Sequence, residues 1–178
     1  MNPKYKILIT GAAGFLGSHL VEKLYELGHK VIGIDNMMGG YEDNIIQGTE
    51  FHKLDCCDLQ KIQEVMEGVD IVYHCAATAH EGLSVFSPYE ITKNNYLASV
   101  SIFTAAINNK VKRIVYCSSM ARYGNSKTPF TESMEPNPID PYAISKVASE
   151  KVLANLCELN NIEYVIACLL YTSPSPRD

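Results

Sequence analysis

The sequence predicts an α/β domain built on a doubly wound parallel sheet, and two features of the chain carry this prediction. Short apolar runs with the length of buried strands alternate with stretches of helical periodicity. The first run, Ile7 to Ile9, breaks at a glycine-rich turn and continues as a helical pattern. The chain has 178 residues, of which 47% are hydrophobic, so it can form one domain with a proper core. We expect residues 1–167 to form that domain, with strand order 3-2-1-4-5-6.

Taken in order, the elements of the predicted fold are six strands, four helices and one long loop. The first helix follows the glycine turn, and its leucines define the expected inward face: Leu16, Leu20, Leu24 and Leu27. Further strands are expected at Lys30 to Ile34 (ending on Asp35), Phe51 to Leu54, Asp70 to Ala77, Arg113 to Cys117 and Ile162 to Ala167. Further helices are expected at Leu59 to Met66 (with Asp58 as N-cap), Pro88 to Asn109 and Tyr142 to about Asn161 (with Asp140 as N-cap), and a loop at Asn36 to Gly48.

The glycine turn after the first strand has the spacing Gly11, Gly14, Gly17. Gly11 permits a tight turn, and Gly14 lets backbone N–H groups at the helix start approach a pyrophosphate. Gly17 lets the helix pack closely on the strand. The turn therefore predicts dinucleotide binding, although a glycine turn without a ligand is an alternative at this point.

Two acidic residues follow strands near the expected cofactor site. Asp35 ends the second strand 18 residues beyond Gly17, where a carboxylate can accept a hydrogen bond from a ribose 2′-hydroxyl and would repel a 2′-phosphate. This placement favours NAD over NADP, whereas the alternative is an aspartate that only caps a turn. Asp55 follows the third strand, whose carboxyl end lies beside the adenine pocket in this strand order.

Two polar residues fall on apolar patterns. We expect His74, in the fourth strand, to be a hydrogen-bonded core residue and not a base or a ligand. Asn95 belongs to an inward stripe of the helix that starts at Pro88, and we expect it to brace backbone near the site. The other members of that stripe are Ile91, Ala98, Ile102 and Ala105.

Three residues near the end of the chain form a candidate acid/base set. Ser119 follows the fifth strand, so its hydroxyl is expected to face the crevice where ligands bind. Tyr142 and Lys146 are four residues apart on one helix face. An ammonium beside a phenol lowers the phenol pKa, so Tyr142 is expected to act as a general acid/base near neutral pH.

Together these residues resemble the extended short-chain dehydrogenase/reductase family, specifically its nucleotide-sugar epimerase/dehydratase branch, over about residues 4–167. The resemblance implies a Rossmann fold, NAD as cofactor, and the catalytic set Ser119, Tyr142 and Lys146. It also implies the following contacts to NAD: Gly11, Gly14, Phe15, Leu16, Gly17, Asp35, Asn36, Asp55, Cys56, Cys75, Ala76, Ala77, Asn95, Tyr142 and Lys146. No metal is implied.

The same resemblance implies an activity and a partner. The expected reaction is 4-epimerisation of a UDP-hexose or dTDP-hexose, in which C4 is transiently oxidised by hydride transfer to NAD. Alternatives are a nucleotide-sugar dehydratase or decarboxylase, and a dinucleotide-binding regulator without catalysis. In this family the helices from Pro88 and Tyr142 form a dimer interface, which implies a homodimer.

The end of the sequence departs from the family pattern. Residues 168–178 resemble the in-frame translation of a sequencing adapter, with a natural Pro/Ser-rich tail as the alternative. The resemblance places a substrate domain after the sixth strand, and we expect this chain to be a fragment without that domain and to be inactive alone.

Composition argues against several other functions. The net charge of −5, without a Lys/Arg cluster, argues against nucleic acid as a partner. No apolar run approaches the ~20 residues of a membrane span, and no signal peptide is recognised, so we expect a cytoplasmic protein. The six cysteines lack Cys-x-x-Cys spacing, which indicates buried thiols and no metal site.

Overall fold

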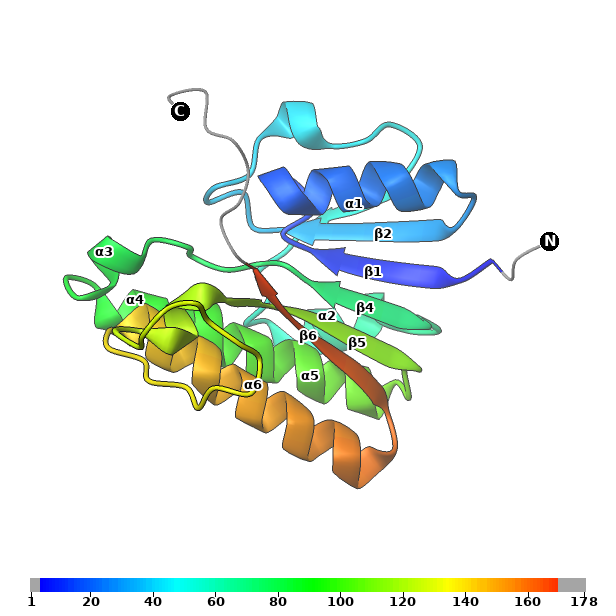
Figure 1. The fold of residues 1–178 in the computed structure, drawn as a ribbon. Coiled ribbons are helices and arrows are strands. Elements are labelled where there is room, and N and C mark those ends of the chain that lie inside the picture. Colours follow the sequence, from blue (N-terminus) through cyan, green and yellow to red (C-terminus); the bar gives the residue numbers. More distant parts are fainter. Residues whose placement is uncertain (1–3, 170–178) are drawn as a thin grey trace.

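The computed structural model describes residues 4–169 and contains a six-stranded parallel sheet in the order β3-β2-β1-β4-β5-β6 (Figure 1). The predicted fold class and strand order are confirmed. The strands are β1 (Lys6–Thr10), β2 (Lys30–Asp35), β3 (Glu50–Lys53), β4 (Ile71–His74), β5 (Arg113–Ser119) and β6 (Glu163–Leu169). Because all pairs are parallel, the carboxyl ends of the strands meet at one edge of the sheet.

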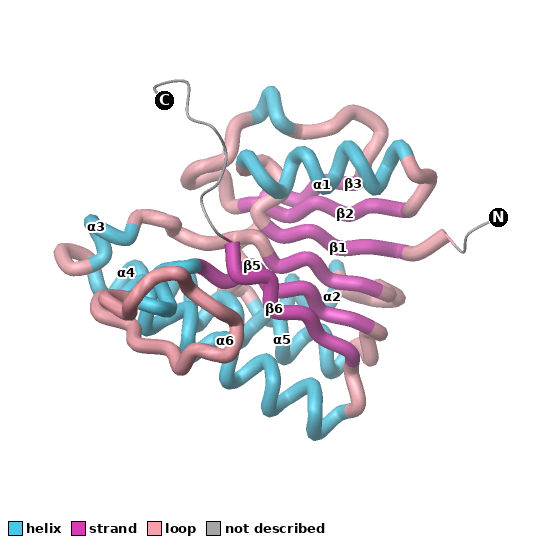
Figure 2. Tube along the Cα trace, viewed as in Figure 1, coloured by secondary structure: helices cyan, strands magenta, loops and turns pink. Residues whose placement is uncertain are grey.

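Helices cover both faces of the sheet, as Figure 2 shows. On one face, α1 (Phe15–Glu26) lies over β1 and β2. The other face is covered by α2 (Leu59–Val65), α5 (Ala98–Asn108) and α6 (Pro141–Asn160). The short helices α3 (Glu81–Ser84) and α4 (Pro88–Ile91) lie beyond the carboxyl ends of the strands (Figure 1).

Alternate strand residues supply two separate apolar clusters, one on each face. Ile7 and Ile9 of β1 pack with Val21 of α1, whereas Leu8 joins the larger cluster beneath α2, α5 and α6. Burying each such side chain contributes about 1.5–3 kcal/mol, so this two-sided burial explains why β1 is apolar at every position from Ile7 to Ile9. Among the described helices, none is long and apolar enough to cross a membrane.

The inward face of α1 differs from the predicted leucine stripe. Leu20 and Leu24 pack against the sheet as expected. However, Leu16 is 37% and Leu27 is 62% exposed. The helix ends at Glu26, so Leu27 is already its C-cap residue, and the start of the helix packs through Gly17 against the backbone of Gly11 in the turn after β1. Leucine spacing therefore identified the helix but not its contact face.

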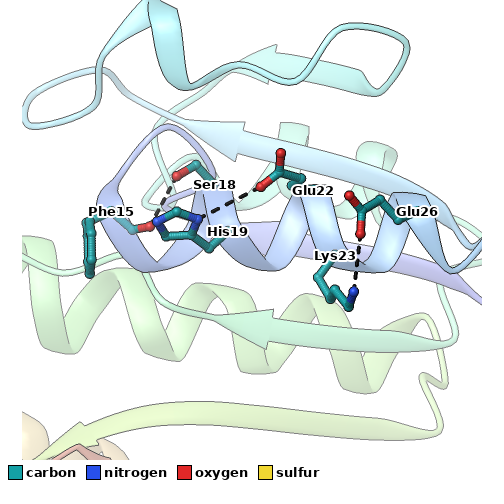
Figure 3. Close-up of polar contacts among 6 residues, drawn as sticks. All are labelled: Phe15, Ser18, His19, Glu22, Lys23 and Glu26. Atoms are coloured by element: carbon teal, nitrogen blue, oxygen red, sulfur yellow. Dashed lines mark hydrogen bonds and ion pairs between the residues drawn. The ribbon is translucent and has the colours of Figure 1, made fainter. Parts of the chain in front are cut away.

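Figure 3 shows polar contacts along α1, and four of the side chains drawn there, His19, Glu22, Lys23 and Glu26, are exposed. His19 and Glu22 are 4.0 Å apart, and Lys23 and Glu26 are 3.2 Å apart, each pair one turn along the helix. Exposed pairs of this kind contribute at most about 1 kcal/mol each. Packing of the inward face, and not surface pairing, therefore holds α1 in place.

The single helix predicted from Pro88 to Asn109 is divided in the structure. A π-helical segment, Thr92–Leu97, separates α4 from α5. The predicted inward stripe is nonetheless confirmed, because Ile91, Asn95, Ala98, Ile102 and Ala105 are all buried. Segments of π-helix are frequent at functional sites, and this one contains the buried amide of Asn95.

The sixth strand runs to Leu169, two residues past its predicted end. Residues 170–178, which make up most of the predicted adapter-derived tail, lie outside the described residues, so the domain boundary after residue 167 stays a prediction. Val165 lies on the sheet face that α1 covers over β1 and β2, and it is 47% exposed. Within residues 4–169, no helix covers β6 on that face.

Candidate functional site

A cavity of about 330 Å³ opens at the carboxyl ends of β1, β2 and β4, where the strand order reverses direction. Ligand pockets typically measure about 300–1,000 Å³, and this edge is where doubly wound sheets bind ligands. Most residues predicted to contact the cofactor line it: Gly11, Gly14, Phe15, Leu16, Gly17, Asp35, Asn36, Asp55, Cys56, Cys75, Ala76 and Ala77. Asn95, Tyr142 and Lys146 do not line this cavity.

The glycine turn has the geometry that its spacing predicts. Gly11 has a φ of +69°, and a Cβ there would lie 2.9 Å from the amide nitrogen of Ala76. A Cβ on Gly17 would lie 2.0 Å from the carbonyl oxygen of Gly11. Gly14 precedes α1 as its N-cap, so the N–H groups of the first helical turn face the cavity end. Only glycine fits at Gly11 and Gly17, and the cavity wall beside them is bare backbone.

Asp35 is buried at the end of β2 and touches two backbone amides. Its carboxylate accepts from the N–H of Ala13 at 3.1 Å and from the N–H of Met37 at 2.8 Å. Asp35 therefore does cap the turn after β2, as the alternative interpretation of this residue expects. A carboxylate has about four lone-pair sites, however, so these two bonds leave acceptor capacity for a ligand hydroxyl in the cavity that Asp35 lines.

Two further aspartates stabilise the start of α2. The carboxylate of Asp55 accepts from the N–H of Cys57 at 2.8 Å, which fixes the turn after β3 at the cavity wall. Asp58 accepts from the N–H of Lys61 at 3.3 Å, so its predicted role as N-cap is confirmed.

His74 is a core residue, as predicted. Its Nδ1 lies 2.7 Å from the Thr10 hydroxyl and its Nε2 lies 2.8 Å from the Ser99 hydroxyl. Full burial lowers the pKa of His74 to about 3, so the ring is neutral. The Thr10 hydroxyl also accepts from the N–H of Ala76 at 3.0 Å, so this network links the core to the cavity wall.

Asn95 braces the backbone after β4, which confirms the role predicted for it. Its side-chain oxygen accepts from the N–H of Thr78 at 2.7 Å, and its amide nitrogen donates to the carbonyl of Thr78 at 3.3 Å. Thr78 lines the cavity. Asn95 therefore positions a wall residue without lining the cavity itself.

The candidate acid/base residues lie at the end of β5 and the start of α6. Ser119 ends β5, and Asp140 caps α6 by accepting from the N–H of Ala143 at 2.9 Å, as predicted. Tyr142 and Lys146 are 7% and 3% exposed, and the Lys146 ammonium lies 5.8 Å from the centroid of the Tyr142 ring. The structure therefore brings the phenol and the ammonium to one buried place.

One expectation about this set is wrong. Burial raises the pKa of Tyr142 above its usual range, and the Ser119 hydroxyl offsets this only in part. The Lys146 ammonium, which donates to the carbonyl of Cys117 at 2.8 Å, does not contribute to lowering it. Burial instead lowers the pKa of Lys146 to about 8. In this structure Tyr142 is a protonated phenol.

A buried charged cluster behind this site was not anticipated. Glu150 accepts a hydrogen bond from the Ser118 hydroxyl and lies 3.3 Å from the Arg122 guanidinium, with only 7% of its side chain exposed. It stands one helical turn beyond Lys146. The four-residue spacing of Tyr142, Lys146 and Glu150 places all three on one face of α6 and was the available signal.

Several cavity residues were also missed. Some lie in loops without a periodic pattern, and the others occupy positions that look like ordinary core or helix positions. The missed residues are Met38, Gly39, Gly40, Leu54, Thr78, His80, Asn94 and Ala98. Gly39 and Gly40 follow Asp35 closely, so that adjacent glycine pair was the one usable sequence signal among them.

The sheet order, the glycine turn and the cavity together define a Rossmann-type nucleotide-binding domain. More specifically, the chain belongs to the NAD dependent epimerase/dehydratase family, whose model matches residues 7–172. NAD is thus the cofactor of the family in which this chain falls.

Curated relatives and solved structures agree with this assignment. The chain is 34% identical to a UDP-glucose 4-epimerase of Halalkalibacterium halodurans over 175 residues, which cover 97% of this chain and 52% of the relative. A Thermotoga maritima UDP-glucose 4-epimerase solved with UDP-glucose is 32% identical, with a TM-score of 0.87, covering 90% of this chain and 54% of that one. A Brucella ovis UDP-glucose 4-epimerase solved with NAD is 31% identical, with a TM-score of 0.86, covering 91% and 50%. The chain spans about half the length of the relatives it matches.

Proposed function

We propose that this chain is the cofactor-binding half of an NAD-dependent nucleotide-sugar 4-epimerase that acts on a UDP-hexose. The carrying observation is that a glycine turn and a strand-end carboxylate share one cavity, while the half-buried Ser119 at the end of β5 and the buried Tyr142 and Lys146 of α6 lie at the same edge of the sheet. The similarity to UDP-glucose 4-epimerases, some solved with UDP-glucose or NAD, supports this proposal.

The cavity fits NAD in two respects. The side-chain-free wall at Gly11 and Gly17 leaves backbone N–H groups of the α1 start facing the cavity, which suits a pyrophosphate. Asp35 supplies an acceptor for a ribose hydroxyl and would repel the phosphate of NADP. Held there by the glycine turn and Asp35, NAD would supply reversible hydride acceptance for oxidation at C4 of the sugar.

The roles proposed for the acid/base set follow from its chemistry. Tyr142 would take the proton from the sugar 4-hydroxyl and later return it, and the Ser119 hydroxyl would hydrogen-bond to the same oxygen. Because burial raises the pKa of Tyr142, the phenol needs a positive charge nearby to act as a base. In the structure the Lys146 ammonium lies 5.8 Å from the ring centroid and donates to the carbonyl of Cys117, so we propose that it moves closer to the phenol oxygen when it supplies this charge.

Cofactor choice is tested by Asp35→Asn, which removes the charge and retains an acceptor oxygen. Wild-type chain should bind NAD(H) much more tightly than NADP(H), and the variant should narrow this difference because the 2′-phosphate is no longer repelled. Fluorescence titration with NADH and NADPH measures both affinities. Asp43→Asn is the matched control, since Asp43 is exposed in the loop after β2. Equal wild-type affinities would contradict the role of Asp35.

The dehydratase alternative is disfavoured by the segment that directly follows β5. Family members that eliminate water place an acidic pair after the serine, whereas this chain has Met120 and Ala121, which carry no titratable proton. Full-length protein containing this chain should therefore interconvert UDP-hexoses and form no 4-keto-6-deoxy product. Mass spectrometry of the products distinguishes the two reactions, and a 4-keto-6-deoxy sugar would overturn the proposal.

The regulator alternative is disfavoured by the complete acid/base set, because a cofactor sensor needs no proton-transfer residues. NAD binding without turnover of any UDP- or dTDP-hexose by the full-length protein would support a regulator instead. The homodimer and the cytoplasmic location stay predictions from the sequence.

A further inference from the structure

Two thiols meet at the wall of the cofactor cavity. Cys75 directly follows β4 and lines the cavity, and Cys117 lies near the end of β5. Their Sγ atoms are 3.6 Å apart, within hydrogen-bonding distance for sulfur, and both cysteines are free. The strands pair in parallel with His74 opposite Tyr116, so the two cysteines are the next residues in the same register.

We propose that Cys75 and Cys117 form a reversible disulfide when a peroxide enters the cavity, which makes this pair an oxidative modification site beside the cofactor. Neighbouring strands lie about 4.7–4.9 Å apart, and disulfides bridge Cα atoms about 4.4–6.8 Å apart, so the backbone separation already permits the bond. Side-chain rotation must close only the remaining gap between the sulfurs.

The surroundings favour Cys117 as the attacking thiol, whereas the hydrogen bond with Cys117 and burial raise the pKa of Cys75. The hydrogen bond with Cys75 and the nearby Lys146 ammonium lower the pKa of Cys117, and burial opposes them. By contrast, burial raises the pKa of Cys56 to about 12 and those of Cys57 and Cys157 to about 11. Since the thiolate is the reactive form, Cys117 is the better nucleophile.

The reaction balances with hydrogen peroxide as the oxidant. The Cys117 thiolate attacks one peroxide oxygen, an S–O bond forms, the O–O bond breaks, and the departing hydroxide takes a proton to become water. The Cys75 thiol then loses its proton and attacks the Cys117 sulfur, so that the S–S bond forms and the S–O bond breaks with release of a second water. Two thiols and one peroxide yield one disulfide and two waters.

The position of Cys75 links this site to the cofactor, a step that rests on the proposed function. Cys117 does not line the cavity, so peroxide that enters there must pass Cys75 to reach it, and NAD bound over Cys75 should block that approach. If only the free cavity reacts, NAD at ten times its Kd should slow oxidation about tenfold.

The test uses the wild-type chain, treated with hydrogen peroxide under native conditions, alkylated, digested and analysed by mass spectrometry. We expect a peptide pair joined through Cys75 and Cys117, with the loss of two hydrogen atoms, that dithiothreitol reverses. Cys75→Ser and Cys117→Ser should each abolish the linked pair, whereas Cys157→Ser, a buried cysteine elsewhere in the core, should retain it.

Alkylatable thiols at both Cys75 and Cys117 after exposure to excess peroxide would overturn the proposal, and this outcome depends on no variant. Repeating the oxidation with NAD present separates the two claims. A disulfide that forms at the same rate with and without NAD would count against NAD binding in this cavity, while the disulfide site itself would stand.

Discussion

Gly17→Ala tests the packing that builds the cavity wall. A Cβ on Gly17 would lie 2.0 Å from the carbonyl oxygen of Gly11 and 2.7 Å from its carbonyl carbon. Both atoms belong to the backbone, and real Cβ contacts essentially never fall under 3.0 Å. The start of α1 must therefore move away from the glycine turn by about 1 Å or more, which close packing resists.

The expected cost follows from two opposing effects. Overpacking costs about 1–3 kcal/mol, and the upper value applies here because neither colliding group is a flexible side chain. Replacing a helical glycine by alanine returns about 1 kcal/mol through helix propensity. The free energy of unfolding should therefore fall by about 2 kcal/mol, which for a domain of this size lowers Tm by about 4–8 °C.

Urea unfolding followed by circular dichroism measures this difference. Gly82→Ala is the matched control, because Gly82 is also helical and a Cβ there would meet no atom within 4 Å. The control should be as stable as the wild type or slightly more so. A Gly17→Ala chain that matches the control would refute the argument that helix and turn meet too closely for a side chain.

Five further substitutions test the buried polar groups. His74 takes up a proton near pH 6.5 in the unfolded chain but only near pH 3 in the folded chain. The free energy of unfolding should therefore fall by up to about 1.4 kcal/mol for each pH unit below about 6.5. Urea titrations at several pH values should show a smaller fall for His74→Gln than for the wild type. Glu150→Ala leaves the largely buried Arg122 without its carboxylate, so the free energy of unfolding measured in urea should fall by about 3–5 kcal/mol. Glu150→Gln should lower it by less. Equal losses in the two variants would show that the charge of Glu150 is unimportant. In the full-length protein, Tyr142→Phe should reduce turnover by about 10²–10⁴-fold and leave the affinity for NAD unchanged. Lys146→Ala should reduce both turnover and NAD affinity. Near-normal turnover of Tyr142→Phe would contradict the role of Tyr142 as general acid/base.

Local signals were sufficient where one chemical requirement acts on a short stretch of chain. The φ of +69° at Gly11 and the contact at Gly17 are what a glycine turn before a helix requires, and the N-caps Asp58 and Asp140 were recognisable because a capping side chain acts within three residues. His74 was also placed correctly, since an imidazole within a buried parallel strand must find hydrogen-bond partners.

Local signals failed where distant residues decide the outcome. The leucine stripe of α1 named Leu16 and Leu27 as inward residues, but the proximity of Gly11 sets the contact face. The pKa of Tyr142 was misjudged, because burial of the phenol raises it, and the Lys146 ammonium donates to the carbonyl of Cys117, 29 residues earlier.

The sequence by itself therefore determined the order of the strands, the glycine turn and the position of Asp35 at a strand end. It also determined that Tyr142 and Lys146 lie on the same face of one helix. These features depend on spacing along the chain. Only the tertiary structure decided which partners the buried groups meet: Glu150 with Arg122, Lys146 with Cys117, and Cys75 with Cys117. The physical reason is that pKa values and thiol distances depend on burial and on neighbours across strands, and both are set when the sheet assembles.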